Sequence, residues 1–170
     1  MKSGFSWEVA DKYQWHNQFK ERFDLNISDH KNKVAKRLLS EIGIDSSLWY
    51  VCVHVRESGF RNDYGRREYR NSSIYNYIPA IKVITDAGGF VVRIGDASMT
   101  PLPELQNVID YPFSSKKNPL LDLFLIKNCR FYIGTGSGPA SVAEIFNKDI
   151  LFTNMDHWML NYPLGIKDRG

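Results

Sequence analysis

The segment 130–146, RFYIGTGSGPASVAEIF, places three glycines two residues apart, at Gly134, Gly136 and Gly138. They follow a β-rich stretch and precede Pro139 and an apolar pattern with helical spacing. Glycine allows a sharp turn and keeps Cβ atoms away from an approaching group. Proline suits the first turn of a helix, where free N–H groups and the helix dipole favour an anion. We therefore expect a phosphate or diphosphate at this loop, the alternative being a tight strand-to-helix turn without a ligand.

Polar residues and glycines also follow the other apolar, strand-like segments, and hydroxyl groups add hydrogen-bond donors to the glycine loop. The candidate ligand-binding residues are Arg56, Arg93, Gly95, Thr135, Gly136, Ser137, Gly138 and Asn154. Arg56 is the strongest phosphate candidate, because an arginine is always charged and its planar fork matches phosphate oxygens. For Arg93 the alternative is a structural ion pair.

Two further residues are candidates for a catalytic base, His54 and Asp96. His54 and Arg56 alternate along one strand, so their side chains should point to the same face of the sheet. A buried histidine that only makes hydrogen bonds is the alternative for His54. The sequence assigns the general base to neither residue.

Other catalytic signatures are missing from the sequence. Pro139 stands where G-x-G-x-x-G requires its last glycine, and no lysine follows the glycines as in a Walker A loop. Thr135 stands where the nucleophile elbow G-x-S-x-G requires its first glycine. The histidines, His16, His30, His54 and His157, lack the spacing of metal ligands, and no D-x-D pair is present. We therefore expect no metal.

These residues need a parallel sheet to bring them together. Strands are expected within residues 49–55, 90–95, 107–112, 130–134 and 149–154, and helices within 5–23, 28–44, 73–89, 118–129 and 139–147. The alternation predicts a doubly wound, Rossmann-like α/β sheet of about five mostly parallel strands. We expect the strand order third, second, first, fourth, fifth, with the switch point between the first and fourth strands. Ligands bind at the carboxyl ends of the strands at such a point.

Segment 1–46 is interpreted as a helical extension that packs outside the sheet without lining the pocket, and 47–170 as the binding domain. Within 73–89, Pro79 should kink the helix. No apolar run is long enough to span a membrane, and the N-terminus lacks the apolar core of a secretory signal. Cys52 and Cys129 lie in apolar stretches and are interpreted as buried thiols, with a disulfide or a ligand pair as alternatives. A cytoplasmic location is expected.

The composition is that of an ordinary soluble protein, with 43% hydrophobic and 24% charged residues and a net charge of +3. Five arginines nevertheless fall within fifteen positions: Arg56, Arg61, Arg66, Arg67 and Arg70. This stretch is either a solvated loop or a site for a polyanion.

Three segments carry a family resemblance: VCVHVRESGF at 51–60, the stretch 69–99 with VVRIGD, and the stretch 108–138 ending in FYIGTGSG. Together they resemble a bacterial glycosyltransferase-like family with an H-x-R end on the first strand and R-x-G-D on the second. The match covers roughly 51–154, and more distantly it is similar to the fucosyltransferase group of GT-B enzymes. The resemblance implies the C-terminal half of a GT-B architecture, binding a nucleotide-sugar as substrate without a metal or other cofactor. The family's phosphate arginine carries over to Arg56 and its anion-binding loop to Gly136, Ser137 and Gly138.

GT-B enzymes have two Rossmann-like halves, whereas segment 1–46 reads as helical. The chain therefore resembles the donor half alone, as a fragment, a free-standing module or a degenerate relative. The leading expectation is a glycosyltransferase donor domain in which Arg56, Arg93 and a helix N-terminus stabilise the diphosphate leaving group. The alternatives are a non-catalytic nucleotide or phosphosugar module and, less favoured, a nucleic-acid binder. A homo- or hetero-oligomer is expected, because a GT-B half alone leaves its cleft face uncovered.

Overall fold

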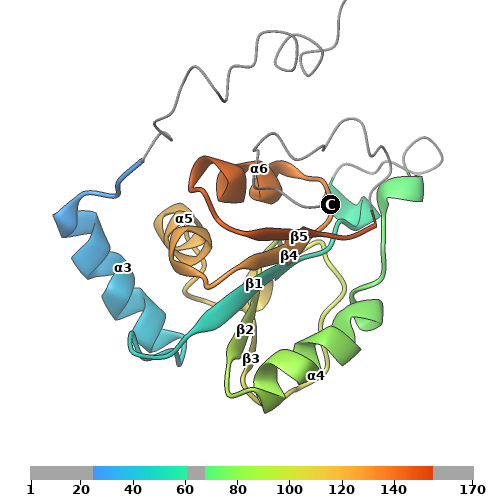
Figure 1. The fold of residues 1–170 in the computed structure, drawn as a ribbon, viewed down its shortest axis with the longest axis horizontal. Helices are drawn as coiled ribbons and strands as arrows, with labels where there is room; N and C mark the ends of the chain where they lie inside the picture. The colour runs from blue at the N-terminus through green and yellow to red at the C-terminus, as the bar shows by residue number, and fades with distance from the viewer. Residues whose placement is uncertain (1–24, 61–67, 155–170) are drawn as a thin grey trace, which may run out of the picture.

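The computed structural model describes residues 25–60 and 68–154, so the helix expected within 5–23 lies outside the described residues. Five strands form one sheet: β1 Tyr50–His54, β2 Phe90–Arg93, β3 Val108–Asp110, β4 Tyr132–Gly134 and β5 Ile150–Phe152. Every pairing is parallel and the order is β3-β2-β1-β4-β5 (Figure 1). The predicted fold class, strand order and switch point between β1 and β4 are therefore confirmed.

β1 is the central strand, and all five of its residues are buried. Cys52 lies opposite Val92 of β2 on one side and opposite Tyr132 of β4 on the other. A strand covered on both faces must be apolar throughout, which is why the run YVCV shows no polar alternation. Cys52 and Cys129 are buried free thiols, as predicted.

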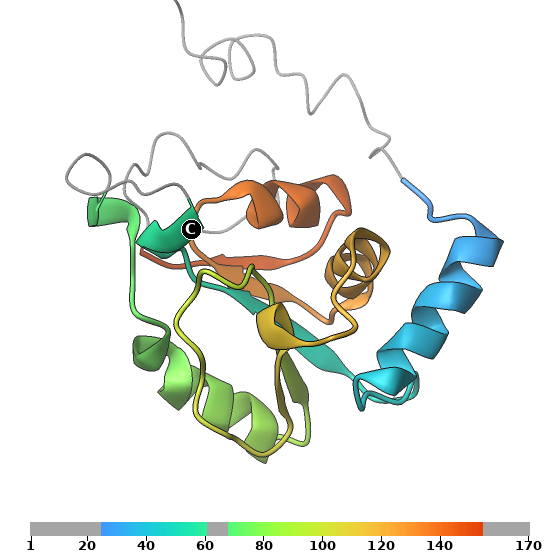
Figure 2. The same ribbon diagram turned by 180° about the vertical axis from the view of Figure 1, so that it is seen from behind.

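Helices cover both faces of the sheet, as Figures 1 and 2 show from opposite sides. The helices are α3 Asp29–Glu41, α4 Ile78–Asp86, α5 Pro119–Asn128 and α6 Gly138–Ile145. α4 packs on one face in a cluster with Val51, Val53 and Val91. α5 and α6 pack on the other face, and α3 lies outside α5 and shares the same apolar cluster. The described part of segment 1–46 is thus helical and contributes no residue to the cavity described below.

The helix expected within 73–89 is divided rather than kinked. Ile74–Tyr77 forms a 3-10 turn, and α4 begins at Ile78 with Pro79 in its first turn. Proline is tolerated there because the first N–H groups of a helix have no partner inside it. The hydroxyl of Ser73 accepts from the backbone N–H of Tyr75 at 3.3 Å and caps the 3-10 turn. Pro79 therefore starts the α-helix instead of interrupting it.

Three other short 3-10 turns lie near the carboxyl ends of the strands: Ser58–Phe60, Glu68–Arg70 and Tyr111–Phe113. α5 begins at a side-chain cap, where Oδ1 of Asn118 accepts from the N–H of Leu121 at 3.0 Å. Within residues 25–60 and 68–154, no helix combines the length and the apolar character needed to cross a membrane.

Candidate functional site

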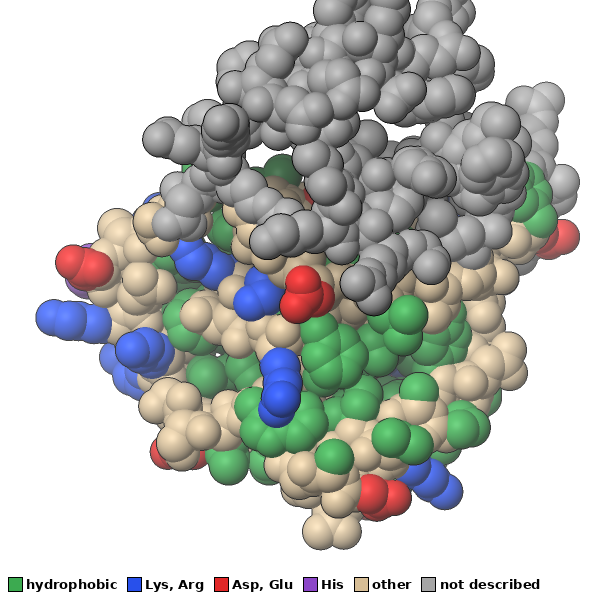
Figure 3. Space-filling model, viewed as in Figure 1, with side chains coloured by type: hydrophobic (Ala, Val, Ile, Leu, Met, Phe, Trp, Pro, Cys, Tyr) green, Lys and Arg blue, Asp and Glu red, His purple; other side chains and the backbone are tan. Residues whose placement is uncertain are grey.

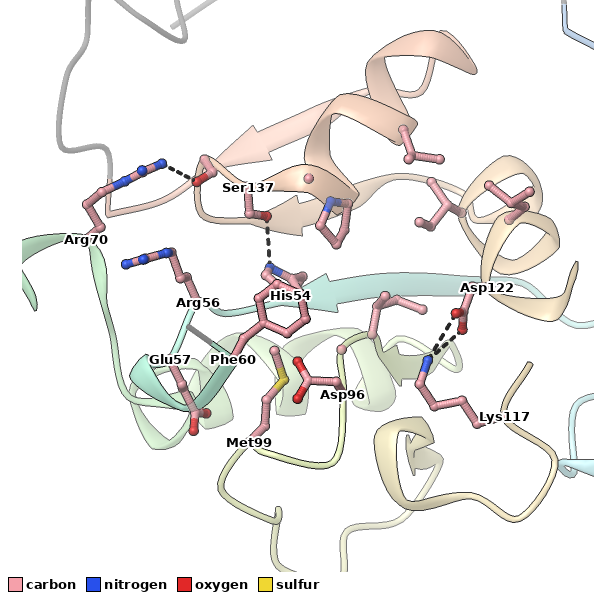
Figure 4. A pocket seen from close by; sticks show the side chains of 18 residues that line it. His54, Arg56, Glu57, Phe60, Arg70, Asp96, Met99, Lys117, Asp122 and Ser137 are labelled. Atoms are coloured by element: carbon pink, nitrogen blue, oxygen red, sulfur yellow. Dashed lines mark hydrogen bonds and ion pairs between the residues drawn. The ribbon is translucent and has the colours of Figure 1, made fainter. Parts of the chain in front are cut away.

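A cavity of about 620 Å³ opens beyond the carboxyl ends of β1, β2 and β4 (Figure 4). It lies at the switch point, where the order of the strands reverses between β1 and β4. Its volume is in the range of pockets that bury small organic ligands. A cavity is thus present at the edge of the sheet where the sequence predicts that a ligand binds.

Most of the candidate residues line this cavity, whereas three do not. The lining residues among them are His54, Arg56, Gly95, Asp96, Gly136, Ser137 and Gly138. The three that the structure places elsewhere are Arg93, Thr135 and Asn154. Each of these three instead holds part of the cavity wall in place.

Arg56 is held from two directions. Its Nη1 donates to Oδ1 of Asn71 at 2.6 Å, and its backbone N–H donates to Oγ1 of Thr135 at 3.0 Å. Thr135 is buried, so its hydroxyl serves the backbone of Arg56 rather than a ligand. The bond crosses the switch point and fixes Arg56 beside the glycine loop, as expected from the strand order.

Arg70 is a lining residue that the sequence did not single out. It ends the turn Glu68–Arg70, and its Nη2 donates to the carbonyl oxygen of Gly136 at 2.9 Å. Nδ2 of Asn154 donates to the carbonyls of Arg70 and Asn71, at 3.3 and 3.2 Å. Asn154 thus ties the segment that carries Arg70 to the end of β5.

The other three arginines of the basic stretch, Arg61, Arg66 and Arg67, lie outside the described residues. Nothing in the local pattern distinguished Arg70 from them, because its approach to the glycine loop depends on the path of the chain. Arg56 and Arg70 nevertheless line one end of the cavity together, next to the first turn of α6.

The glycine loop is explained only in part by a ligand. A Cβ atom on Gly134 would lie 2.7 Å from the carbonyl oxygen of His54, so β1 itself excludes a side chain there. A Cβ atom on Gly138 would meet nothing within 4 Å. Among the described residues, the glycines with positive φ are Gly43, Gly88 and Gly95, so the loop does not need the left-handed region. Packing against β1 therefore accounts for Gly134 without a ligand, whereas Gly138 leaves the N-terminus of α6 open.

His54 is buried, with 5% of its surface exposed, and its Nδ1 lies 3.1 Å from Oγ of Ser137. Burial is the largest cause that lowers the pKa of His54, to about 4, and the positive charge of Arg93 acts in the same direction. The carboxylate of Asp96 opposes the shift. The imidazole is therefore neutral at pH 7 and bonded to the residue that precedes α6.

Arg93 forms the structural ion pair that was its alternative. Its side chain is fully buried, with Nη2 2.9 Å from Oε1 of Glu57 and Nη1 3.1 Å from Oδ1 of Asp110. Nη1 also donates to the carbonyl of Thr100. The remaining carboxylate oxygens accept backbone N–H groups, from Thr100 for Glu57 and from Leu102 for Asp110. The guanidinium therefore joins three segments of the chain and is not available to a ligand.

The far end of the cavity carries a second ion pair. Nζ of Lys117 lies 2.9 and 3.0 Å from the two carboxylate oxygens of Asp122, in the first turn of α5. Asp122 also lines the cavity. Ile126 and Val142 add an apolar wall between α5 and α6. The cavity therefore has a basic end, a paired end and an apolar side.

No group of three or more His, Cys, Asp or Glu side chains that could hold a metal ion occurs within the described ranges.

In comparisons with known proteins, no family model, no curated protein and no solved structure matches this chain. The resemblance to a bacterial glycosyltransferase-like family therefore stays a prediction. Measuring which ligands bind in the cavity would test it.

Proposed function

We propose that this chain binds a nucleotide-diphosphate-sugar as a metal-independent, glycosyltransferase-like donor domain. The observation that carries the proposal is the convergence of Arg56, Arg70 and the N-terminus of α6 on one end of the switch-point cavity. Two guanidinium groups and free backbone N–H groups suit the oxygens of a diphosphate. The volume of about 620 Å³ leaves room for the organic part of such a ligand.

In a transfer reaction, the same groups would act on the leaving diphosphate. Negative charge develops there as the bond to the sugar breaks, and donors already fixed in place stabilise it without reorganising. Arg56 is fixed by Asn71 and Thr135, and Arg70 is fixed by the carbonyl of Gly136. Arg93 has no part in this scheme, because Glu57 and Asp110 already bind it.

A non-catalytic nucleotide or phosphosugar module is the second candidate, and the pKa of His54 favours it. A base with a pKa of about 4 accepts a proton from an acceptor hydroxyl only weakly. Asp96 also lines the cavity and is the other candidate base. Release of free nucleotide from UDP- or GDP-sugars distinguishes the two, because a binding module releases none with or without an added acceptor.

The proposal is tested by titrating the purified chain with UDP, GDP and inorganic pyrophosphate in a calorimeter. Replacing Arg56 by alanine should weaken diphosphate binding by about 1.5–3 kcal/mol, the scale of a hydrogen bond to a charged group. Lysine should restore only part of the affinity, because it cannot form a bidentate contact. Arg37→Ala is the matched control, since Arg37 is 73% exposed on α3 and does not line the cavity.

If Arg56→Ala binds diphosphates as tightly as the parent, the assignment of the anion end is wrong. If no nucleotide diphosphate and no pyrophosphate binds the parent chain, the proposed function is wrong as a whole.

Association with a second copy or another chain also remains a prediction. Figure 3 shows hydrophobic side chains gathered over a wide area of one face, with few charged side chains among them. Val83 on α4 is 70% exposed and Leu151 on β5 is 57% exposed. Apolar areas of this kind are commonly covered by a partner. Sedimentation at high concentration is the measurement that decides between a monomer and an oligomer.

A further inference from the structure

Three acidic side chains line the described part of the cavity, and they differ in what their oxygens already bind. Both oxygens of Glu57 are engaged, one by Arg93 and the other by the backbone N–H of Thr100. Both oxygens of Asp122 lie within 3.0 Å of Nζ of Lys117. In both residues the negative charge is already paired with a cation of the chain, Arg93 for Glu57 and Lys117 for Asp122.

Asp96 is different, because only one of its carboxylate oxygens is used. Oδ1 accepts from the backbone N–H of Ser98 at 2.8 Å, and the N–H of Met99 donates to the Asp96 carbonyl at 3.2 Å. These bonds close a turn after β2 and fix the orientation of the carboxylate. Oδ2 makes no hydrogen bond with any residue that the structure describes, and Figure 4 shows the side chain pointing into the cavity.

An aromatic ring lines the same cavity as this carboxylate. Phe60 ends the turn Ser58–Phe60 and lines the cavity, although 70% of its surface is exposed. The preceding residue packs directly on the Asp96 turn, because a Cβ on Gly59 would lie 2.5 Å from the carbonyl oxygen of Ser98. The turns that carry Phe60 and Asp96 therefore adjoin each other at the wall of the cavity. Such a ring is a surface on which an apolar ligand face can pack.

We propose that Asp96 and Phe60 form a subsite for a polyhydroxylated ring of the bound ligand. Asp96 accepts hydrogen bonds from adjacent ring hydroxyls, and the C–H face of the ring packs on Phe60. The inference rests on the proposed function, in which Arg56 and Arg70 hold the phosphate groups of the same molecule. The ring is either the ribose of a nucleotide or the sugar of a glycosyl phosphate, since both present vicinal hydroxyls.

This role requires only an acceptor oxygen held in place, and no proton needs to leave the ligand. It gives Asp96 a function that does not depend on its acting as a general base. A nucleotide or a sugar phosphate would contact both this subsite and the basic end of the cavity, whereas pyrophosphate would contact the basic end alone.

The test uses the full chain and calorimetric titration with four kinds of probe: inorganic pyrophosphate, UDP and GDP, their 2′-deoxy forms, and glucose 1-phosphate. The variant is Asp96→Asn, which keeps Oδ1 for the N–H of Ser98 and replaces only Oδ2. Asp86→Asn is the matched control, because Asp86 is exposed at the end of α4 and does not line the cavity.

Asp96→Asn should bind ring-bearing ligands about tenfold or more weakly, the effect of losing a hydrogen bond to a charged group, and should bind pyrophosphate as the parent does. Asp86→Asn should match the parent with every probe. If the parent prefers UDP or GDP to their 2′-deoxy forms and Asp96→Asn does not, the ring is the ribose. If glucose 1-phosphate loses affinity instead, the ring is the sugar.

Phe60→Ala provides a second variant, since an exposed side chain can be removed with little effect on folding. It should weaken ring-bearing ligands and leave pyrophosphate unaffected. Unchanged affinity of Asp96→Asn for every ring-bearing probe, with pyrophosphate still bound at Arg56, overturns the subsite while the proposed function stands. Failure of the parent to bind pyrophosphate and every nucleotide overturns both.

Discussion

Acidification should destabilise the fold through His54, and the size of the effect follows from its burial. The folded-state pKa is about 4, against 6.5 for a histidine in water. Between these values the unfolded chain binds a proton at this position and the folded chain does not. The contribution of His54 to stability is therefore fully present above pH 6.5 and is lost as the pH falls toward 4. At 1.36 kcal/mol for each pKa unit, the complete loss amounts to about 3 kcal/mol.

The assay is urea unfolding of the parent and of His54→Gln at pH 7 and at about pH 4.5. Both proteins contain the same carboxylates that titrate in this range. The difference between the two proteins in how the free energy of unfolding depends on pH therefore reports on His54 alone. The parent should lose about 2 kcal/mol more than the variant on acidification. A titration of the His54 ring by NMR gives an independent reading. Equal pH dependence of the two proteins, or a His54 resonance that titrates near its ordinary value, would refute the reasoning.

Two further predictions concern stability. Gly134→Ala should cost about 1–3 kcal/mol in urea unfolding, because the new Cβ would overlap the carbonyl oxygen of His54, whereas Gly138→Ala should be close to neutral, because a Cβ there meets open space. Equal effects of the two substitutions would contradict this. Arg93→Met should lower the free energy of unfolding by about 3–5 kcal/mol, because it leaves the carboxylates of Glu57 and Asp110 without their shared cation. A loss below about 1 kcal/mol would show that Arg93 does not hold these segments together.

The sheet could be predicted from the sequence because its signals are local. Each strand is a short apolar run, each connection is a helical pattern, and the handedness of crossovers leaves few arrangements. A ligand site could then be predicted at the switch point, where the structure has a cavity that seven of the ten candidate residues line. Glycines and polar residues that follow strands reach that edge whatever the details of packing.

The failures involve partners distant in the sequence. Arg93 stands at a strand end, where ligand-binding residues are expected. Its partners Glu57 and Asp110 lie 36 and 17 positions away in the sequence, so the ion pairs could not be predicted from local spacing. Arg70 reaches Gly136 across 66 positions, which no spacing rule indicates. In both cases the missing information was the path of a loop.

The bonds that join β1 to β4 also have a consequence for the order of events in folding. Arg56 and Thr135 are 79 residues apart, and His54 and Ser137 are 83 apart. Contacts of such long range form slowly, because a large loop must close before any bond compensates the lost entropy. The basic end of the cavity is therefore completed only when the central parallel pair has closed. A ligand that recognises this end should slow unfolding of the finished domain far more than it accelerates folding.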